Sequence, residues 1–259
     1  MISLFKRNWL PRNVVEECLD YYEKNDIFLN KTKEYNLIKE VLLSNKKIKF
    51  EDMKQFVAQT RNNMYTEFSF YKENNYKNHS SDIITDIYFK KVLYVKFSLW
   101  DKLSPIKFMK ILDSINKDFL IIDLRSCTGG YLKSCLEICN MLLPECEIVS
   151  LNYKRKIVTY YSDEYYYKFK KIFIMLDKST ASSCEILAYS LYTNLNNVVL
   201  LGEPTFQKTF GQDYIINKKY NFYFLVPTFK WFIKDFSFDS VYIKPLKSSF
   251  LSQIEPFIN

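Results

Sequence analysis

The sequence predicts an α/β fold in which a parallel central sheet follows an N-terminal helical region. Two continuous apolar runs, at 119–122 and 172–176, are typical of strands buried on both faces of a parallel sheet. Each run ends at an aspartate and leads through a short polar loop into an amphipathic helix, which is the repeat expected of such a sheet. With 259 residues, of which 48% are hydrophobic, the chain can bury a full core.

The first 70 residues show apolar positions at helical spacing, so we expect helices there. The three expected stripes are Val14, Cys18 and Tyr22; Ile38, Val41 and Leu42; and Met53, Phe56 and Val57. Residues 69–86 are polar and uneven, which predicts a surface connection. We therefore divide the chain into a helical region with its connection at 1–86 and a core at 87–259.

The core is expected to begin with a half-buried strand at 93–97, where apolar and polar residues alternate. Ser104 can cap the helix that follows and Pro105 can open it. The inward positions expected on the core helices are Met109, Leu112 and Ile115; then Leu132, Leu136, Cys139 and Leu143; then Ile186, Leu187 and Leu191.

The two loops after the apolar runs are the candidate site, because open α/β sheets build their sites at the carboxyl ends of parallel strands. The first loop reads RSCTGG and holds Gly129 and Gly130, two of only four glycines in the chain. A tight turn would explain them, since glycine adopts positive φ without strain. In the second loop Ser182 stands where a helix begins, so it could be a helix cap or a nucleophile beside the helix dipole.

A nucleophilic serine needs a base, and the candidates are few. His79 is the only histidine and lies in the polar connection, which disfavours a Ser-His-Asp arrangement. A buried lysine can serve as the base, because burial disfavours its charged form. Lys208 lies in the segment 202–212, which follows the apolar run 198–201 and holds the other two glycines.

Three motifs in this order resemble the C-terminal processing (tail-specific) serine peptidases. An apolar strand, then D-L-R, then G-G is matched by 120–130. The nucleophile signature S-A-S-A-S-E-I is matched by 180–186, which reads TASSCEI, and G-E-x-T-F-G-K-G-x-x-Q is matched by 202–212, which reads GEPTFQKTFGQ. The resemblance covers residues 87–232.

The resemblance implies a serine endopeptidase that acts through an acyl-enzyme and matures or trims a peptide or protein substrate. Ser182 would be the nucleophile, Lys208 the general base and Gln212 the residue that positions the lysine. The backbone N–H of Ser183 and that of Gly129 or Gly130 would form the oxyanion hole. The implied fold is a crotonase-like or Clp-protease-like spiral of strand-strand-helix units.

The chain departs from the family pattern at two places. The segment 63–68 resembles D-P-Y-T-x-F, after which most members carry a PDZ domain, but only about 20 residues follow before the core. We therefore expect no PDZ domain at this point, which puts the family's gating of access in doubt. Gln207 and Thr209 replace the glycines beside the lysine, so this loop must use a less permissive backbone.

Other function classes fit less well. The net charge of +8 comes from short, dispersed basic runs, which indicate solvated faces rather than a nucleic-acid groove. The six cysteines show no C-x-x-C spacing, so we expect reduced thiols, no metal and no cofactor. We also expect no export signal and no membrane span, hence a cytoplasmic protein whose oligomeric state is open and includes a homodimer. A catalytically silent peptide-binding protein on the same fold is the alternative function.

Overall fold

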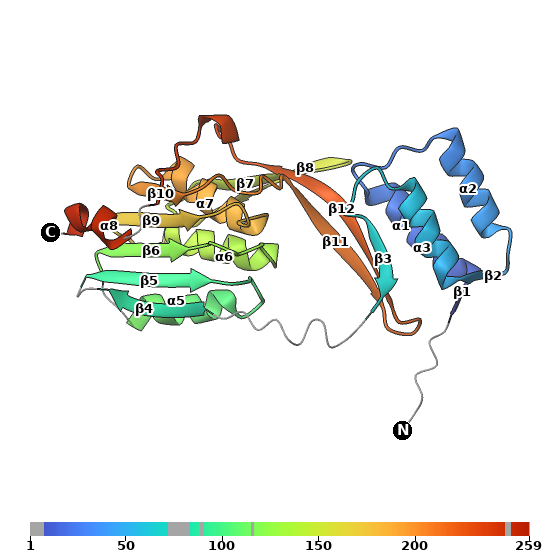
Figure 1. Ribbon diagram of the computed structural model, residues 1–259, viewed down its shortest axis with the longest axis horizontal. Coiled ribbons are helices and arrows are strands. Elements are labelled where there is room, and N and C mark those ends of the chain that lie inside the picture. Colours follow the sequence, from blue (N-terminus) through green and yellow to red (C-terminus); the bar gives the residue numbers. More distant parts are fainter. Residues whose placement is uncertain (1–7, 72–82, 89–90, 115–116, 247–249, 259) are drawn as a thin grey trace, which may run out of the picture. The chain divides into compact units, whose positions relative to one another are not determined.

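The computed structural model describes residues 8–71, 83–88, 91–114, 117–246 and 250–258, and the chain forms two compact units (Figure 1). Unit 1 comprises Met1–Asn78, Asn152–Ile157 and Phe210–Lys230, and unit 2 comprises His79–Leu151, Val158–Thr209 and Trp231–Asn259. Two later segments thus belong with the N-terminal region. The predicted division into a helical region at 1–86 and a core at 87–259 stays a prediction.

Unit 2 is built on a five-stranded sheet with the order β10-β9-β6-β5-β4. Its strands are β4 (Ile83–Tyr88), β5 (Val92–Phe97), β6 (Phe119–Asp123), β9 (Lys171–Leu176) and β10 (Val198–Gly202). The four strands from β5 to β10 are parallel, and β4 pairs antiparallel with β5 at the edge. The predicted α/β class with a parallel central sheet is therefore confirmed.

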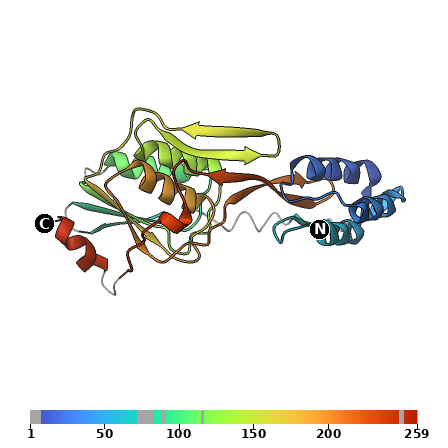
Figure 2. The ribbon, with the colours of Figure 1, turned by 90° about the horizontal axis from the view of Figure 1, so that it is seen from above.

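Helices cover both faces of this sheet. Figure 2 shows α6 (Leu132–Leu142) and α7 (Ser183–Asn194) along one face and α8 (Phe250–Ile258) on the other. Ile121 and Phe173 pack in one buried cluster with Ile254 of α8. The alternate positions Leu120 and Ile172 point to the opposite face and are also buried. Burial on both faces explains why these strands are continuous apolar runs rather than alternating ones.

The strand order brings four loops to one edge of the sheet. β6 lies in register beside β9, β9 lies beside β10, and β5 lies beside β6 on the other side. Because the four strands are parallel, the segments after their carboxyl ends are neighbours at that edge. These segments contain Trp100 after β5, the loop RSCTGG after β6, Ser182 after β9 and Lys208 after β10.

Unit 1 packs three helices against a sheet. The helices are α1 (Arg12–Asn25), α2 (Lys33–Leu43) and α3 (Phe50–Thr60). Tyr22, Met53 and Phe56 share a buried cluster with Phe222 and Phe224 of the strand β12 (Phe222–Phe232). The sequence stripes of α1 and α3 are thereby confirmed.

A second sheet has the order β11-β12-β7-β8, with β3 also paired to β12. Its strands besides β12 are β3 (Glu67–Phe70), β7 (Glu147–Tyr153), β8 (Lys156–Tyr161) and β11 (Phe210–Asn217). The remaining elements are β1 (Trp9–Pro11) paired with β2 (Lys47–Lys49), α5 (Ser104–Ser114) and a 3-10 turn at Phe238–Ser240.

Several predicted inward positions are wrong. Val41 is 65% exposed and Met109 is 40% exposed, because α2 buries Tyr35 together with the predicted Leu42, and α5 buries Phe108 together with the predicted Leu112. On α6 the buried stripe is Ser134, Cys135, Ile138, Cys139 and Leu142, which leaves Leu132 and Leu136 at its margin. A helical stripe can be shifted by one position without changing its period, so the sequence pattern alone fixes it only loosely.

The polar connection is also shorter than predicted. Residues 69–70 end β3, and 83–86 belong to β4, so the ends of the range 69–86 are strands. The predicted half-buried strand at 93–97 lies within β5, which is almost wholly buried because helices cover both faces. His79 and Ile115 lie outside the described residues.

Candidate active site

Ser182 occupies a strained turn between β9 and α7. Its backbone has φ 59° and ψ −124°, a conformation that non-glycine residues rarely adopt. The Ser182 N–H donates to Oε2 of Glu185 at 2.7 Å, which holds this turn from the first turn of the helix. Strained residues of this kind cost about 1–3 kcal/mol and concentrate at active sites, where a nucleophile on a strand-to-helix turn is exposed to substrate.

The RSCTGG loop packs directly against this serine. Gly129 has φ +103°, and a Cβ there would lie 2.9 Å from the carbonyl oxygen of Ala181 and 2.9 Å from Cβ of Ser182. The Ala181 N–H also donates to the carbonyl oxygen of Cys127 at 3.1 Å. Only a residue without a side chain allows the two loops to come this close.

Trp100 supports the same loop from the other side. Its N–H donates to the carbonyl oxygen of Gly129 at 3.1 Å, and its carbonyl oxygen accepts from the Tyr131 N–H at 3.1 Å. Gly130 has φ +143°, and a Cβ there would lie 2.4 Å from the Trp100 carbonyl oxygen. Both glycines are therefore required by close backbone approach as well as by positive φ.

Three backbone N–H groups belong to the two loops that meet at this junction. Among the described residues, no protein acceptor takes a hydrogen bond from the N–H of Gly129, Gly130 or Ser183. Ser183 is the first residue of α7, where N–H groups have no partner within the helix and the helix dipole favours negative charge. This arrangement can receive an oxyanion.

The Lys208 segment is tied to the serine turn through one carboxylate. Glu185 is fully buried, and its Oε1 accepts from Thr205 Oγ1 and from the Gln207 N–H, each at 2.6 Å. Its Oε2 accepts from the Lys208 N–H at 3.0 Å in addition to the Ser182 N–H. Gln207 has φ +61°, so the residue that replaces the family glycine adopts a glycine-like conformation.

The surroundings of Lys208 favour its neutral form. Burial lowers the pKa of Lys208 below the usual value for lysine, while the nearby Glu185 carboxylate acts in the opposite direction and raises it. The Lys208 carbonyl oxygen accepts from Nε1 of Trp231 at 2.8 Å, which fixes the backbone at this position. A lowered pKa makes the neutral amine, which is the form that a general base requires, easier to reach.

Gln212 belongs to unit 1, unlike the other predicted site residues. It lies in β11, and its Nε2 donates to the carbonyl oxygen of Tyr65 at 2.8 Å. Within unit 2 the structure brings Gly129, Gly130, Ser182 and Ser183 together. The predicted role of Gln212 in positioning Lys208 stays a prediction.

Cys127 and Cys184 lie between the two loops. Their sulfur atoms meet where the RSCTGG loop contacts the first turn of α7, and both residues are fully buried. Because β6 and β9 are neighbours, the fold brings together two cysteines that are 57 residues apart in sequence. The expectation of reduced thiols stays a prediction.

A buried ion pair shapes the start of the RSCTGG loop. Asp123 is fully buried and binds Arg125 through Nε at 2.9 Å and Nη2 at 2.6 Å, and it also accepts from the Tyr94 hydroxyl at 2.7 Å. Although burial alone would raise it, these donors keep the pKa of Asp123 below the usual value.

Asp123→Asn is expected to lower the free energy of unfolding by about 2–3 kcal/mol, because it leaves Arg125 without its charged partner beside a buried amide. Asp118→Asn is the matched control, since Asp118 pairs with Lys170 on the surface at 2.9 Å and its loss should cost under about 1 kcal/mol. Urea denaturation of both variants would measure the difference. Equal losses would contradict a structural role for the Asp123 pair.

Two features of this region were not predicted from the sequence. Trp100 gave no signal, because it follows β5 outside any recognised motif, yet its backbone holds both glycines. Glu185 was recognised only as part of the nucleophile signature, and nothing in the sequence showed that its carboxylate reaches the Lys208 segment.

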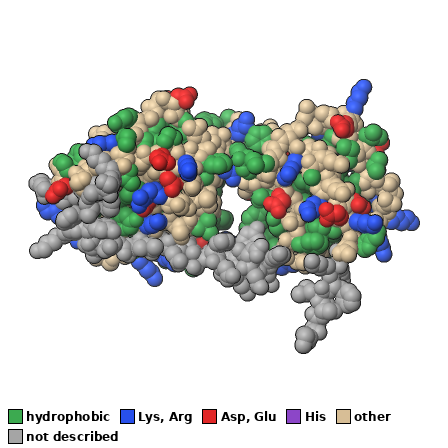
Figure 3. Space-filling view, in the orientation of Figure 1, with side chains coloured by type: hydrophobic (Ala, Val, Ile, Leu, Met, Phe, Trp, Pro, Cys, Tyr) green, Lys and Arg blue, Asp and Glu red, His purple; other side chains and the backbone are tan. Residues whose placement is uncertain are grey.

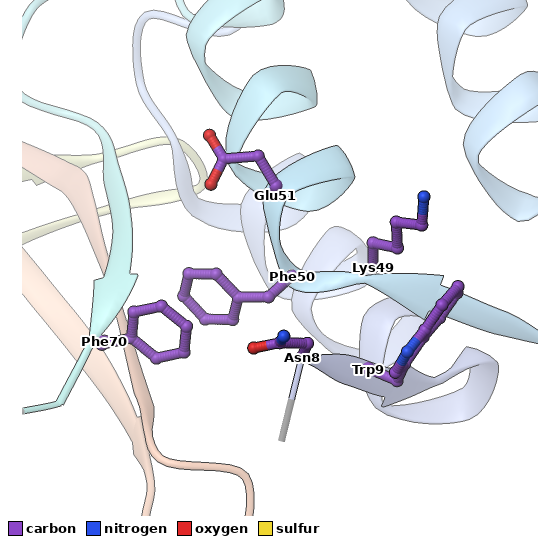
Figure 4. Close-up of a pocket in the computed structure, with 6 residues that line it drawn as sticks. All are labelled: Asn8, Trp9, Lys49, Phe50, Glu51 and Phe70. Carbon is purple, nitrogen blue, oxygen red and sulfur yellow. The ribbon is translucent and has the colours of Figure 1, made fainter. Parts of the chain in front are cut away.

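The structure also contains a pocket in unit 1, with a volume of about 410 Å³ (Figure 4). Its lining residues are Asn8, Trp9, Lys49, Phe50, Glu51 and Phe70. The rings of Phe50 and Phe70 stack with centroids 3.6 Å apart. None of the predicted site residues lines this pocket, so it is separate from the candidate active site.

Comparison with known proteins places the chain in a family. The model of peptidase family S41 matches residues 91–243, which is more than half of the chain. The fold is similar to that of a lipoprotein from Streptococcus agalactiae, with a TM-score of 0.75, 16% identity and coverage of 96% of each chain. It is also similar to a protein described as an S41 protease from Bacteroides fragilis, with a TM-score of 0.50, 14% identity and coverage of 61% of this chain and 47% of the other. These likenesses show the fold, and the family match over 91–243 shows that the chain belongs to peptidase family S41, the serine-type peptidases.

Proposed function

We propose that the protein is a serine endopeptidase that cleaves peptide bonds through a Ser182-Lys208 dyad. The observation that carries the proposal is the strained Ser182 turn with the glycine loop packed against it. The half-buried Lys208, with a lowered pKa, supplies a base in the adjacent segment. Membership of family S41 supports the peptidase class.

In the proposed reaction Lys208, as a neutral amine, takes the proton of the Ser182 hydroxyl while Oγ attacks the peptide carbonyl carbon. The N–H of Ser183 and that of Gly129 or Gly130 stabilise the resulting oxyanion, and one such donor contributes about 3 kcal/mol in other enzymes. The lysine ammonium then protonates the leaving amine, and an acyl-enzyme on Ser182 remains. Lys208 next deprotonates a water molecule, which releases the acid product and restores the serine.

The proposed substrate is a peptide or protein that is matured or trimmed. Only residues 71–82 separate β3 from β4, which is too short a segment for a PDZ domain at the point where most family members are expected to carry one. Selection of substrate C-termini by such a domain is therefore not part of the proposal. An unstructured peptide library, analysed by mass spectrometry after incubation with the protein, would reveal the cleavage sites.

The pH dependence of cleavage tests the role of Lys208. Because the neutral amine is the active form and burial lowers its pKa, kcat/KM should rise with pH and reach half its maximum below the usual lysine pKa of about 10.4. Lys208→Met should abolish cleavage. Lys178→Met is the control, since Lys178 is an exposed lysine in the loop that leads to Ser182. Activity that is flat with pH, or that survives Lys208→Met, would exclude Lys208 as the base.

A catalytically silent peptide-binding protein is the alternative on the same fold, supported by the replaced glycine at Gln207. That residue nevertheless adopts positive φ and donates its N–H to Glu185, so a residue with a side chain is accommodated in a glycine-like conformation. Wild-type protein that binds peptides but neither cleaves them nor forms a covalent adduct with a serine-directed probe would favour this alternative.

The surface gives little support for a nucleic-acid partner. In the view of Figure 3, Lys and Arg side chains lie apart from one another with acidic and uncharged side chains between them. A measured affinity for nucleic acid that falls steeply as the salt concentration rises would contradict this assignment.

No helix in the described ranges is long and apolar enough to cross a membrane. A cytoplasmic location and a homodimer stay predictions.

A further inference from the structure

The carboxylate of Glu185 stands at the point where the two halves of the proposed dyad meet. Ser182 and Gln207 are both non-glycine residues with positive φ, at 59° and 61°, and both donate their N–H to this one side chain. The N–H of Lys208 and the hydroxyl of Thr205 complete the set of four donors. Two strained turns that are 25 residues apart in sequence thus share one acceptor.

The donor set requires the ionised carboxylate. A carboxylate is acceptor-only and can receive several hydrogen bonds at its two oxygens, whereas a carboxylic acid would direct its own proton at one of these donors. Burial raises the pKa of Glu185, and the four donors act against that rise. Besides Lys208, the titratable group facing Glu185 is Tyr189, whose hydroxyl shares a 2.9 Å hydrogen bond with Thr205.

We propose, on the basis of the proposed function, that Glu185 is a positioning residue of the peptidase, which holds Ser182 and the Lys208 segment in their reactive arrangement. It does not touch the substrate. It fixes two backbone turns at once, so that the hydroxyl and the amine approach each other without further reorganisation.

The test compares Glu185→Gln with wild type and with Glu203→Gln. Glutamine keeps the shape of the side chain, but its amide nitrogen cannot accept the hydrogen bonds now made to one of the oxygens. Glu203 is exposed in the same segment, so its replacement controls for loss of one carboxylate there. We expect kcat to fall about 100-fold in E185Q with little change in KM, and to stay at the wild-type value in E203Q.

The pH profile separates positioning from general damage to the fold. The Glu185 carboxylate raises the pKa of Lys208, so its removal should lower that pKa. The acidic limb of the kcat/KM profile should therefore move to lower pH in E185Q, and should not move in E203Q. A loss of activity caused only by a weakened fold would leave the limb in place.

Amide hydrogen exchange provides a readout that does not depend on catalysis. The N–H groups of Ser182, Gln207 and Lys208 should exchange faster in E185Q than in wild type, while amides of β6 should be unchanged. If E185Q does not fold, Thr205→Val removes one donor and leaves the carboxylate; we expect it to show a smaller fall in kcat and faster exchange at Gln207.

Two results would overturn the proposal: wild-type kcat in E185Q, or unchanged exchange at all three amides. A wild-type protein that cleaves no peptide would overturn the proposed function instead, and the exchange measurement would still decide whether Glu185 fixes the two turns. The two failures are therefore distinguishable.

Discussion

Replacing Ser182 by alanine is expected to abolish peptide cleavage, with kcat falling by about 10⁴-fold or more. The hydroxyl is the only group of this residue that the reaction uses, and its removal leaves no nucleophile beside the glycine loop. The fold should be retained, because the Ser182 N–H that binds Glu185 is kept and loss of the N-cap side chain of α7 should cost only about 1 kcal/mol. Release of peptide fragments, followed by mass spectrometry, is the measurement.

Ser183→Ala is the matched control for this experiment. Ser183 is the adjacent serine, and its hydroxyl makes only a 3.4 Å contact with the carbonyl oxygen of Gly130. The proposed reaction uses its backbone N–H, which alanine keeps, so S183A should retain most of the activity. Cleavage that survives S182A but is lost in S183A would show that Ser183, and not Ser182, is the nucleophile.

Gly129→Ala is expected to cause the second largest loss, about 10²–10³-fold in kcat. The added Cβ would meet the backbone of Ala181 and Cβ of Ser182 at 2.9 Å, and φ +103° is unfavourable for alanine. The loop would have to move away from Ser182, which misplaces the oxyanion donors. The strain and loop displacement that the added Cβ causes should also lower the free energy of unfolding by about 1–3 kcal/mol.

Gly202→Ala separates the two effects of that substitution. Gly202 has φ +122°, and a Cβ there would lie 2.0 Å from the carbonyl oxygen of Leu176 rather than against Ser182. It should destabilise the protein by at least as much as G129A while lowering kcat much less, when both are measured below their melting temperatures. A kcat for G129A equal to that of G202A would remove the argument that Gly129 shapes the oxyanion hole.

The sequence predicted the part of the fold that depends on burial on both faces. The apolar runs that became β6 and β9 are continuous because helices cover the sheet on each side, and that requirement is visible in the composition of each strand. The antiparallel strand β4 was missed, because the boundary of a polar segment gives no signal of pairing with β5. The exposed apolar residues Val41 and Met109 were misplaced for a different reason. The helical period of an apolar pattern does not determine which face of the helix is buried.

At the candidate site, the residues proposed to carry the chemistry were named from motifs, whereas those that hold them in place were not. Gly129 and Ser182 have distinctive backbone requirements, so their types and positions are readable in the sequence. Trp100 acts through its backbone N–H and carbonyl oxygen, which any residue possesses, and so leaves no trace in residue type. The close approach of Cys127 and Cys184 depends on which strands are neighbours, and spacing along the chain does not report that.

Covalent trapping tests the central claim, that Ser182 is the nucleophile of a peptidase, most directly. The protein would be treated with a serine-directed phosphonate probe, digested and mapped by mass spectrometry. We predict one adduct, on the peptide that contains Ser182 and at that residue, with labelling lost in S182A and strongly slowed in Lys208→Met. No adduct on the wild-type protein, or an adduct on Ser183 in place of Ser182, would contradict the claim.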